Sequence, residues 1–110
     1  MSWAYQFFCQ KTLEEMHKLF NQWGPWEWYQ GDSYWYGDYL GCAALTDVRI
    51  RIHEWGFEPG KARKYTSLIQ VLQHPGICRS GATRATIDEV FFELLGRLPA
   101  DNIVEIDWYD

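Results

Sequence analysis

Apolar and polar residues alternate along several stretches of this chain, with the two-residue period of β-strands. The clearest alternation covers residues 48–53, where three aliphatic residues are interleaved with two arginines and a histidine. Residues 2–9 alternate in the same way and are rich in aromatic side chains, which favour strands. Residues 65–72 also have the composition of a strand, and residues 103–109 show the same alternation. The pattern therefore predicts a sheet with one largely apolar face.

Two other stretches have apolar residues at the spacing of an amphipathic helix. Thr12 and Glu15 form a capping-box pattern at the start of the first, and the Gly-Pro pair at 24–25 marks its end. Thr86 and Glu89 give the same starting pattern in the second, and a proline follows its last apolar residue. The predicted apolar faces hold Leu13, Met16, Leu19, Phe20 and Trp23 in the first helix, and Ile87, Val90, Phe91, Leu94, Leu95 and Leu98 in the second.

These elements predict a single α+β domain over residues 1–110, in the order β-α-β-β-β-α-β. Consecutive strands between the helices favour antiparallel pairing, so we expect a mainly antiparallel sheet with both helices on one face. A ferredoxin-like or related arrangement fits this order.

Net charge and cysteine content indicate which partners and which cellular compartment suit the domain. The formal net charge of −5 argues against a nucleic-acid partner, which requires a basic surface. Three cysteines without a CxxC pair are typical of a reduced, intracellular protein. The sequence contains no signal-peptide pattern and no apolar run of the ~20 residues that span a membrane. We therefore expect a cytoplasmic protein that binds neither membrane nor nucleic acid.

The most unusual segment is 26–39, where aromatic residues are interleaved with carboxylates. Gly31 and Asp32 have the composition of a turn between two extended pieces. Neighbouring aromatic residues on a strand point to opposite faces, so we expect some of these rings to be exposed. Three interpretations remain open: a buried aromatic core, a platform that stacks on sugar rings, and a protein-binding surface.

A small acidic α+β domain with such a segment resembles the bacterial immunity proteins that neutralise toxins. The resemblance implies a non-catalytic protein that blocks a basic toxin domain with aromatic anchors and carboxylates, and we favour this function. The implied partner-binding residues are Trp26, Trp28, Tyr29, Asp32, Tyr34, Trp35, Tyr36 and Asp38. A homodimer formed through the same aromatic residues is an alternative.

A second function is suggested by the segment from Cys78 to Arg84. Its Cys-x5-Arg spacing is similar to the phosphate-binding loop of cysteine phosphatases, and Cys-Arg-Ser-Gly resembles the active-site loop of single-domain rhodaneses. These resemblances imply a cysteine-dependent enzyme with Cys78 as nucleophile and Arg79 and Arg84 as anion-binding residues. The sequence departs from both families before the cysteine, where His74-Pro75-Gly76 interrupts the expected strand and Ile77 replaces the phosphatase histidine.

Other candidate sites have simpler explanations. The three histidines, His17, His53 and His74, share no metal-ligand spacing, so we expect no metal site and no cofactor. Arg49, Arg51 and His53 form a basic strand face that can bind an anion. We favour instead a structural role in which Glu105 and Asp107 of the last strand lie opposite the arginines.

Overall fold

The computed structural model of the chain describes residues 2–35, 37–45, 47–54, 62–72 and 83–107. These residues form six strands and two helices, arranged as one antiparallel sheet with the order β2-β3-β4-β5-β1-β6. The strands are β1 (Ser2–Cys9), β2 (Trp28–Ser33), β3 (Gly37–Leu45), β4 (Val48–Glu54), β5 (Arg63–Val71) and β6 (Asp101–Ile106). The helices are α1 (Leu13–Trp23) and α2 (Arg84–Arg97).

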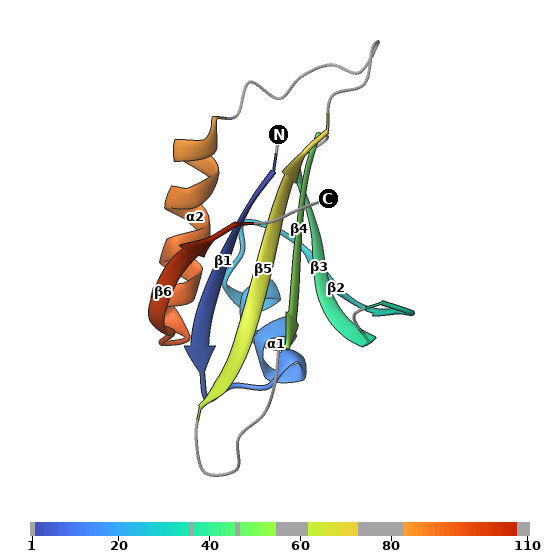
Figure 1. Cartoon of the computed structure of the whole chain (residues 1–110), viewed down its shortest axis with the longest axis vertical. Coiled ribbons are helices and arrows are strands. Elements are labelled where there is room, and N and C mark those ends of the chain that lie inside the picture. The colour runs from blue at the N-terminus through green and yellow to red at the C-terminus, as the bar shows by residue number, and fades with distance from the viewer. Residues whose placement is uncertain (1, 36, 46, 55–61, 73–82, 108–110) are drawn as a thin grey trace.

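Both helices lie on the same face of the sheet, as the sequence predicts (Figure 1). The core forms between them and the sheet, and β1 contributes to it through Trp3, Tyr5, Phe7 and Cys9. We call this side the helix-covered face and the opposite side the open face. The α+β class and the antiparallel pairing are confirmed. The order contains one strand more than predicted, because the aromatic segment forms its own hairpin from β2 and β3.

The predicted start and end of the first helix are confirmed. Thr12 accepts a hydrogen bond from the backbone N–H of Glu15, and the Glu15 carboxylate accepts one from the N–H of Thr12. Gly24 caps the other end with a φ of 67°, in the left-handed region that glycine adopts without strain.

The predicted start of the second helix is wrong by one turn. Thr83, rather than Thr86, is the N-cap, and its hydroxyl accepts the N–H of Thr86. The Thr86 hydroxyl accepts the N–H of Thr83 in return, so that a threonine takes the part expected of Glu89. Two threonines three residues apart satisfy the same orphan N–H groups as the usual Thr–Glu pair.

The turn predicted at Gly31-Asp32 is also wrong, since both residues lie within β2. Gly31 pairs with Tyr39 on β3, and the Tyr39 ring occupies the space in which a Cβ atom on Gly31 would lie. The hairpin instead turns after Ser33, and Gly37 has a φ of 69° on the far side of the turn. Glycine is therefore needed at Gly31 for cross-strand packing and at Gly37 for backbone conformation.

Helix α1 holds the start of the hairpin through side-chain contacts with the backbone of Trp28. The Asn21 amide accepts the N–H of Trp28 at 2.7 Å and donates to its C=O at 3.1 Å. The Trp28 ring is buried and lies 4.9 Å from the ring of Phe20. This contact fixes the position at which β2 leaves the core.

No helix in the described part of the chain is both long enough and apolar enough to cross a membrane.

Replacing Asn21 with Ala tests the contact that anchors the hairpin. We expect the free energy of unfolding in urea to fall by about 1 kcal/mol, because two hydrogen bonds to Trp28 are lost. The Trp28 amide hydrogen is expected to exchange faster with solvent. Gln22→Ala is the matched control on the same helix and leaves Trp28 exchange unchanged. Equal exchange rates in the two variants would show that Asn21 does not anchor the strand.

Candidate binding surface on the β2–β3 hairpin

The tip of the hairpin presents two aromatic side chains to solvent. Tyr34 is 93 % exposed and Trp35 is 82 % exposed. The Ser33 hydroxyl accepts the backbone N–H of Trp35 at 3.2 Å and so orders the turn. The two rings lie 5.2 Å apart at 89° to each other, so the pair does not form a flat platform for a sugar ring. Single exposed aromatic residues are common on monomers, but an adjacent pair at a hairpin tip is typical of a contact site.

On the open face, aromatic rings cover the glycines of the opposite strand. Tyr29 lies over Gly41, and Tyr39 lies over Gly31, with the two ring centroids 6.3 Å apart. The Arg51 guanidinium lies 5.2 Å from the centroid of the Tyr39 ring, which favours a cation–π contact. Tyr29 remains 51 % exposed. These rings extend the aromatic surface from the tip along the hairpin.

Two carboxylates lie on the helix-covered side of the hairpin. Asp32 and Asp38 are directly opposite each other in the register, and both are exposed. Within the described residues, no Lys, Arg or His lies within ion-pair distance of either carboxylate. Like charges at directly opposite positions destabilise a strand pair, so this arrangement favours a cationic partner.

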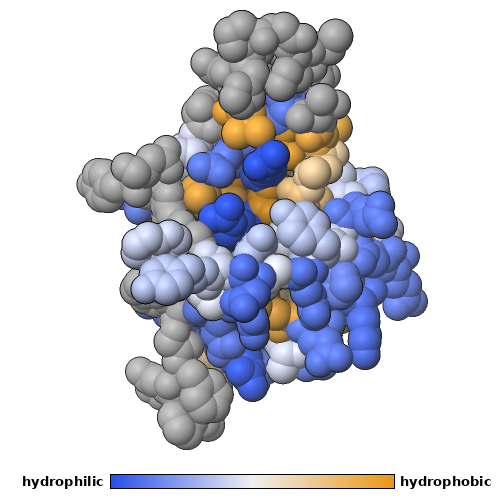
Figure 2. All heavy atoms as spheres, turned by 90° about the vertical axis from the view of Figure 1, so that its right-hand side faces the viewer, coloured by the Kyte–Doolittle hydropathy of each residue, from blue (hydrophilic) through white to orange (hydrophobic). Residues whose placement is uncertain are grey.

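A groove of about 540 Å³ separates the hairpin from the start of α1. It is lined by Thr12, Leu13, Glu14, Gln30, Gly31, Asp38, Tyr39 and Glu54. The three carboxylates in this lining make the groove acidic. Two of these carboxylates form ion pairs: Glu54 with Arg63 at 3.0 Å and Glu14 with Lys18 at 3.9 Å. Figure 2 shows this side of the molecule, with hydrophilic residues over its lower half and an apolar area above.

The structure separates the predicted partner-binding residues into two groups. Tyr29, Asp32, Tyr34, Trp35 and Asp38 are exposed on one hairpin. Trp28 is buried and Trp26 packs against the core, so the prediction that these two rings contact a partner is wrong. Strand alternation predicted that Trp28 and Tyr29 point to opposite faces, but not which of them is buried. Tyr36 lies outside the described residues. Gln30 of β2, Glu14 of α1 and Glu54 of β4 also line the groove. Sequence reasoning did not identify them, because only tertiary packing brings α1 and β4 to the hairpin.

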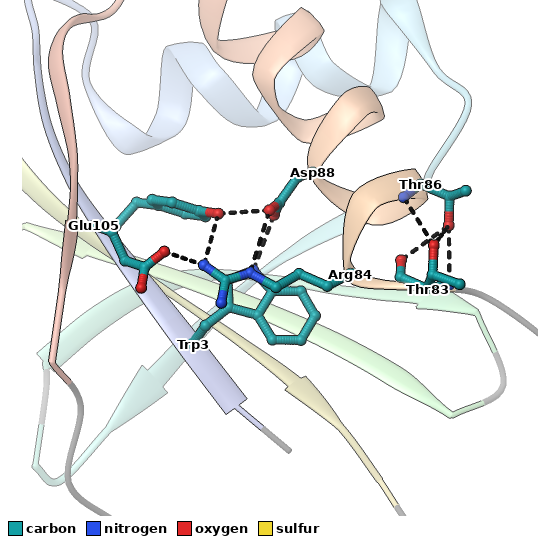
Figure 3. Close-up of polar contacts among 7 residues, drawn as sticks. Trp3, Thr83, Arg84, Thr86, Asp88 and Glu105 are labelled. Carbon is teal, nitrogen blue, oxygen red and sulfur yellow. Dashed lines mark hydrogen bonds and ion pairs between the residues drawn. The ribbon is translucent and has the colours of Figure 1, made fainter.

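A second polar cluster joins β1, α2 and β6 (Figure 3). The Asp88 carboxylate accepts hydrogen bonds from the Trp3 indole N–H at 2.9 Å and from the Tyr5 hydroxyl at 2.6 Å. Arg84 forms ion pairs with Asp88 and with Glu105, and its guanidinium lies 5.2 Å from the centre of the Trp3 ring. Burial, followed by the hydrogen bond to Asp88, raises the pKa of Tyr5 and keeps its hydroxyl protonated as a donor. The cluster fastens α2 to the sheet.

Arg84 of this cluster is also one of the anion-binding residues predicted in the segment from Cys78 to Arg84. Cys78 and Arg79 lie outside the described residues, as does His74. Arg84 is described, and its guanidinium contacts carboxylates on α2 and β6. The described cysteines, Cys9 and Cys42, are buried. Burial raises the pKa of Cys42 to about 12, so this thiol stays protonated and unreactive near neutral pH.

The predicted pairing of Glu105 and Asp107 with the basic strand face is wrong. Strand β6 is separated from β4 by β5 and β1, and Glu105 lies opposite Tyr5, on the helix-covered face. Strand β6 instead pairs antiparallel with β1 at the edge of the sheet, so its carboxylates cannot reach the arginines of β4. His53 is buried, and desolvation, followed by the charge of Arg51, lowers its pKa below the usual value. At neutral pH the positive charge of this face therefore comes from Arg49 and Arg51.

No family model, curated protein or solved structure matches the chain. Among the described residues there is also no group of three or more His, Cys, Asp or Glu side chains placed to hold a metal ion.

Replacing Asp88 with Ala tests the polar cluster. Trp3 and Tyr5 would each lose the acceptor for a partly buried donor, so we expect the free energy of unfolding to fall by about 3 kcal/mol. Urea unfolding followed by tryptophan fluorescence measures this change. Glu89→Ala is the neighbouring control and is expected to change stability by less than about 0.5 kcal/mol. A similar small effect at Asp88 would mean that the cluster does not fasten α2.

Proposed function

We propose that this chain is a non-catalytic protein-binding domain that contacts its partner through the β2–β3 hairpin. The observation that carries the proposal is the pair of exposed rings, Tyr34 and Trp35, beside two carboxylates that lack a cation within the described structure. Aromatic side chains supply much of the binding energy at protein interfaces. Carboxylates without an internal cation attract a basic partner and increase its rate of association.

We further propose that the chain works as a cytoplasmic immunity-type protein that neutralises a cognate toxin. An acidic surface with aromatic anchors suits the occlusion of a basic active site, such as one that binds a nucleic-acid backbone. The hairpin projects from the sheet beyond α1, which would allow its tip to enter a concave site (Figure 1). No chemistry from this chain is required for inhibition of that kind.

The aromatic tip is tested by the double variant Tyr34→Ala/Trp35→Ala. Candidate partners are captured from a lysate of the source cells, identified, purified and titrated against each variant by calorimetry. We expect the double variant to lose at least about 2 kcal/mol of binding free energy and to keep the wild-type melting temperature, because neither ring packs in the core. Val104→Ala, at an apolar residue 48 % exposed on β6, is the control and is expected to bind normally. A large fall in melting temperature in the double variant would show that the rings are structural.

The carboxylates are tested by Asp32→Asn/Asp38→Asn. Removing the like-charge pair is expected to raise the free energy of unfolding by a few tenths of a kcal/mol. The same change is expected to slow association with the captured partner and to weaken the dependence of the association rate on salt. Stopped-flow mixing between low and high NaCl concentrations measures both effects. Asp107→Asn, at an exposed carboxylate beyond β6, is the control. Unchanged association in the hairpin variant would exclude steering by these two residues.

A further inference from the structure

Strand β2 lies at one edge of the sheet, with β3 on its inner side. The N–H and C=O of Trp28 point outward, away from β3, because both bond to Asn21 of α1. Outward and inward residues alternate along an antiparallel strand, so the backbone groups of Gln30 and Asp32 also point outward. No described residue forms a hydrogen bond with these groups. Asn21 and His17 therefore satisfy the edge at Trp28, and beyond Trp28 the edge is unpaired among the residues that the structure describes.

An open strand edge is a template for pairing with an extended segment of another chain. The two sides of this edge differ in chemistry. On the helix-covered side, Asp32 lies opposite Asp38, which lines the acidic groove. On the open face, the rings of Tyr29 and Tyr39 lie over the glycines of the hairpin. Side chains of an added strand would point alternately to these two sides.

We infer that the edge of β2 accepts an extended segment of the protein partner in which basic residues alternate with apolar residues. The basic side chains lie toward Asp32 and the groove, and the apolar side chains lie against the rings of Tyr29 and Tyr39. Backbone hydrogen bonds form at Gln30 and Asp32. This inference rests on the proposed function, since it specifies how the same partner contacts the hairpin.

Charge complementarity distinguishes this partner from a second copy of the chain. A second β2 strand would bring another Asp32 beside the carboxylates of the first, and the chain has a formal net charge of −5. Glu14 and Glu54 already have Lys18 and Arg63 nearby, which leaves Asp32 and Asp38 as the main attraction for a basic segment. The other edge strand, β6, has an irregular register with β1, so its outer edge is less regular for pairing with an added strand.

The edge geometry can be tested on the full chain without a partner. Amide hydrogen exchange followed by NMR is expected to show fast exchange at Gln30 and Asp32, and slower exchange at Tyr29 and Gly31, which face β3. Trp28 is also expected to exchange slowly because its N–H is bonded to Asn21. Slow exchange at Gln30 and Asp32 in the free chain would mean that the edge is already paired, and would overturn the inference.

Strand addition is tested with a short synthetic peptide in which Lys alternates with Val. We expect the peptide to shift the amide signals of Gln30 and Asp32 and to slow their exchange at least about threefold at saturation. A peptide in which Glu replaces Lys controls for charge. A Lys–Val peptide with N-methyl groups along both edges controls for backbone pairing, and both controls are expected to bind at least about tenfold more weakly. Equal binding of the methylated peptide, or no shift at Gln30 and Asp32, would overturn the inference.

Substitution at Asp32 separates backbone pairing from charge. Asp32→Pro removes the outward N–H and leaves the ladder to β3 intact, since edge strands accept proline at such positions. Asp32→Asn removes the same charge and keeps the N–H. We expect the Pro variant to bind the Lys–Val peptide at least about tenfold more weakly than the Asn variant. Equal binding would overturn the inference. If the Pro variant does not fold, Gln30→Pro against Gln30→Ala makes the same comparison.

The inference and the proposed function can fail separately. If Tyr34→Ala/Trp35→Ala abolishes partner binding and Asp32→Pro binds the partner as well as Asp32→Asn does, the tip is the contact site and strand addition is wrong. If only Asp32→Pro weakens the partner complex, the edge is the contact site and the aromatic tip does not anchor the partner.

Discussion

The packing of both helices on one face of the sheet constrains the rest of this structure. The helix-covered side of β1, with Trp3, Tyr5 and Phe7, is buried against the helices. Helix α1 packs against the β2 side of the sheet, where Phe20 and Asn21 contact Trp28. Two short helices cannot cover six strands, so the β2–β3 hairpin extends beyond their cover. Its aromatic residues therefore divide into one that is buried and several that meet solvent.

The charged residues follow from the same arrangement. Arg84, Arg63 and Arg97 each lie beside a carboxylate within the described structure, and Arg84 also helps to hold α2 against β1 and β6. The hairpin contributes carboxylates and no basic residue of its own. Among the described residues, no cation forms an ion pair with Asp32 or Asp38, and these carboxylates belong to the same hairpin as the exposed rings of Tyr34 and Trp35. This charge and these rings are the basis for proposing that the hairpin contacts a basic protein partner.

The two proposed modes of contact, at the aromatic tip and along the edge of β2, place different demands on a partner. Exposed rings at the tip require a pocket or an apolar patch. An open backbone edge requires an extended segment and is less sensitive to sequence, because main-chain hydrogen bonds supply part of the affinity. Alternating side chains on the two sides of β2 then give specificity, since one side is acidic and the other aromatic. A partner that uses both contacts would be held more firmly than one that uses either alone.

The sequence by itself determined the elements whose signals are local. The Thr12–Glu15 capping box and the glycine after α1 predicted the bounds of that helix. Alternation identified β1 and β4, and composition identified β5, each to within a residue or two. Alternation also predicted that Trp28 and Tyr29 would differ in exposure. Tertiary structure decided the features that depend on distant residues. Gly31 belongs to a strand because the ring of Tyr39 fills the space beside it, and Glu105 meets Arg84 because β6 pairs with β1. Local spacing does not encode which strands become neighbours, because that choice depends on how the whole sheet buries its apolar face.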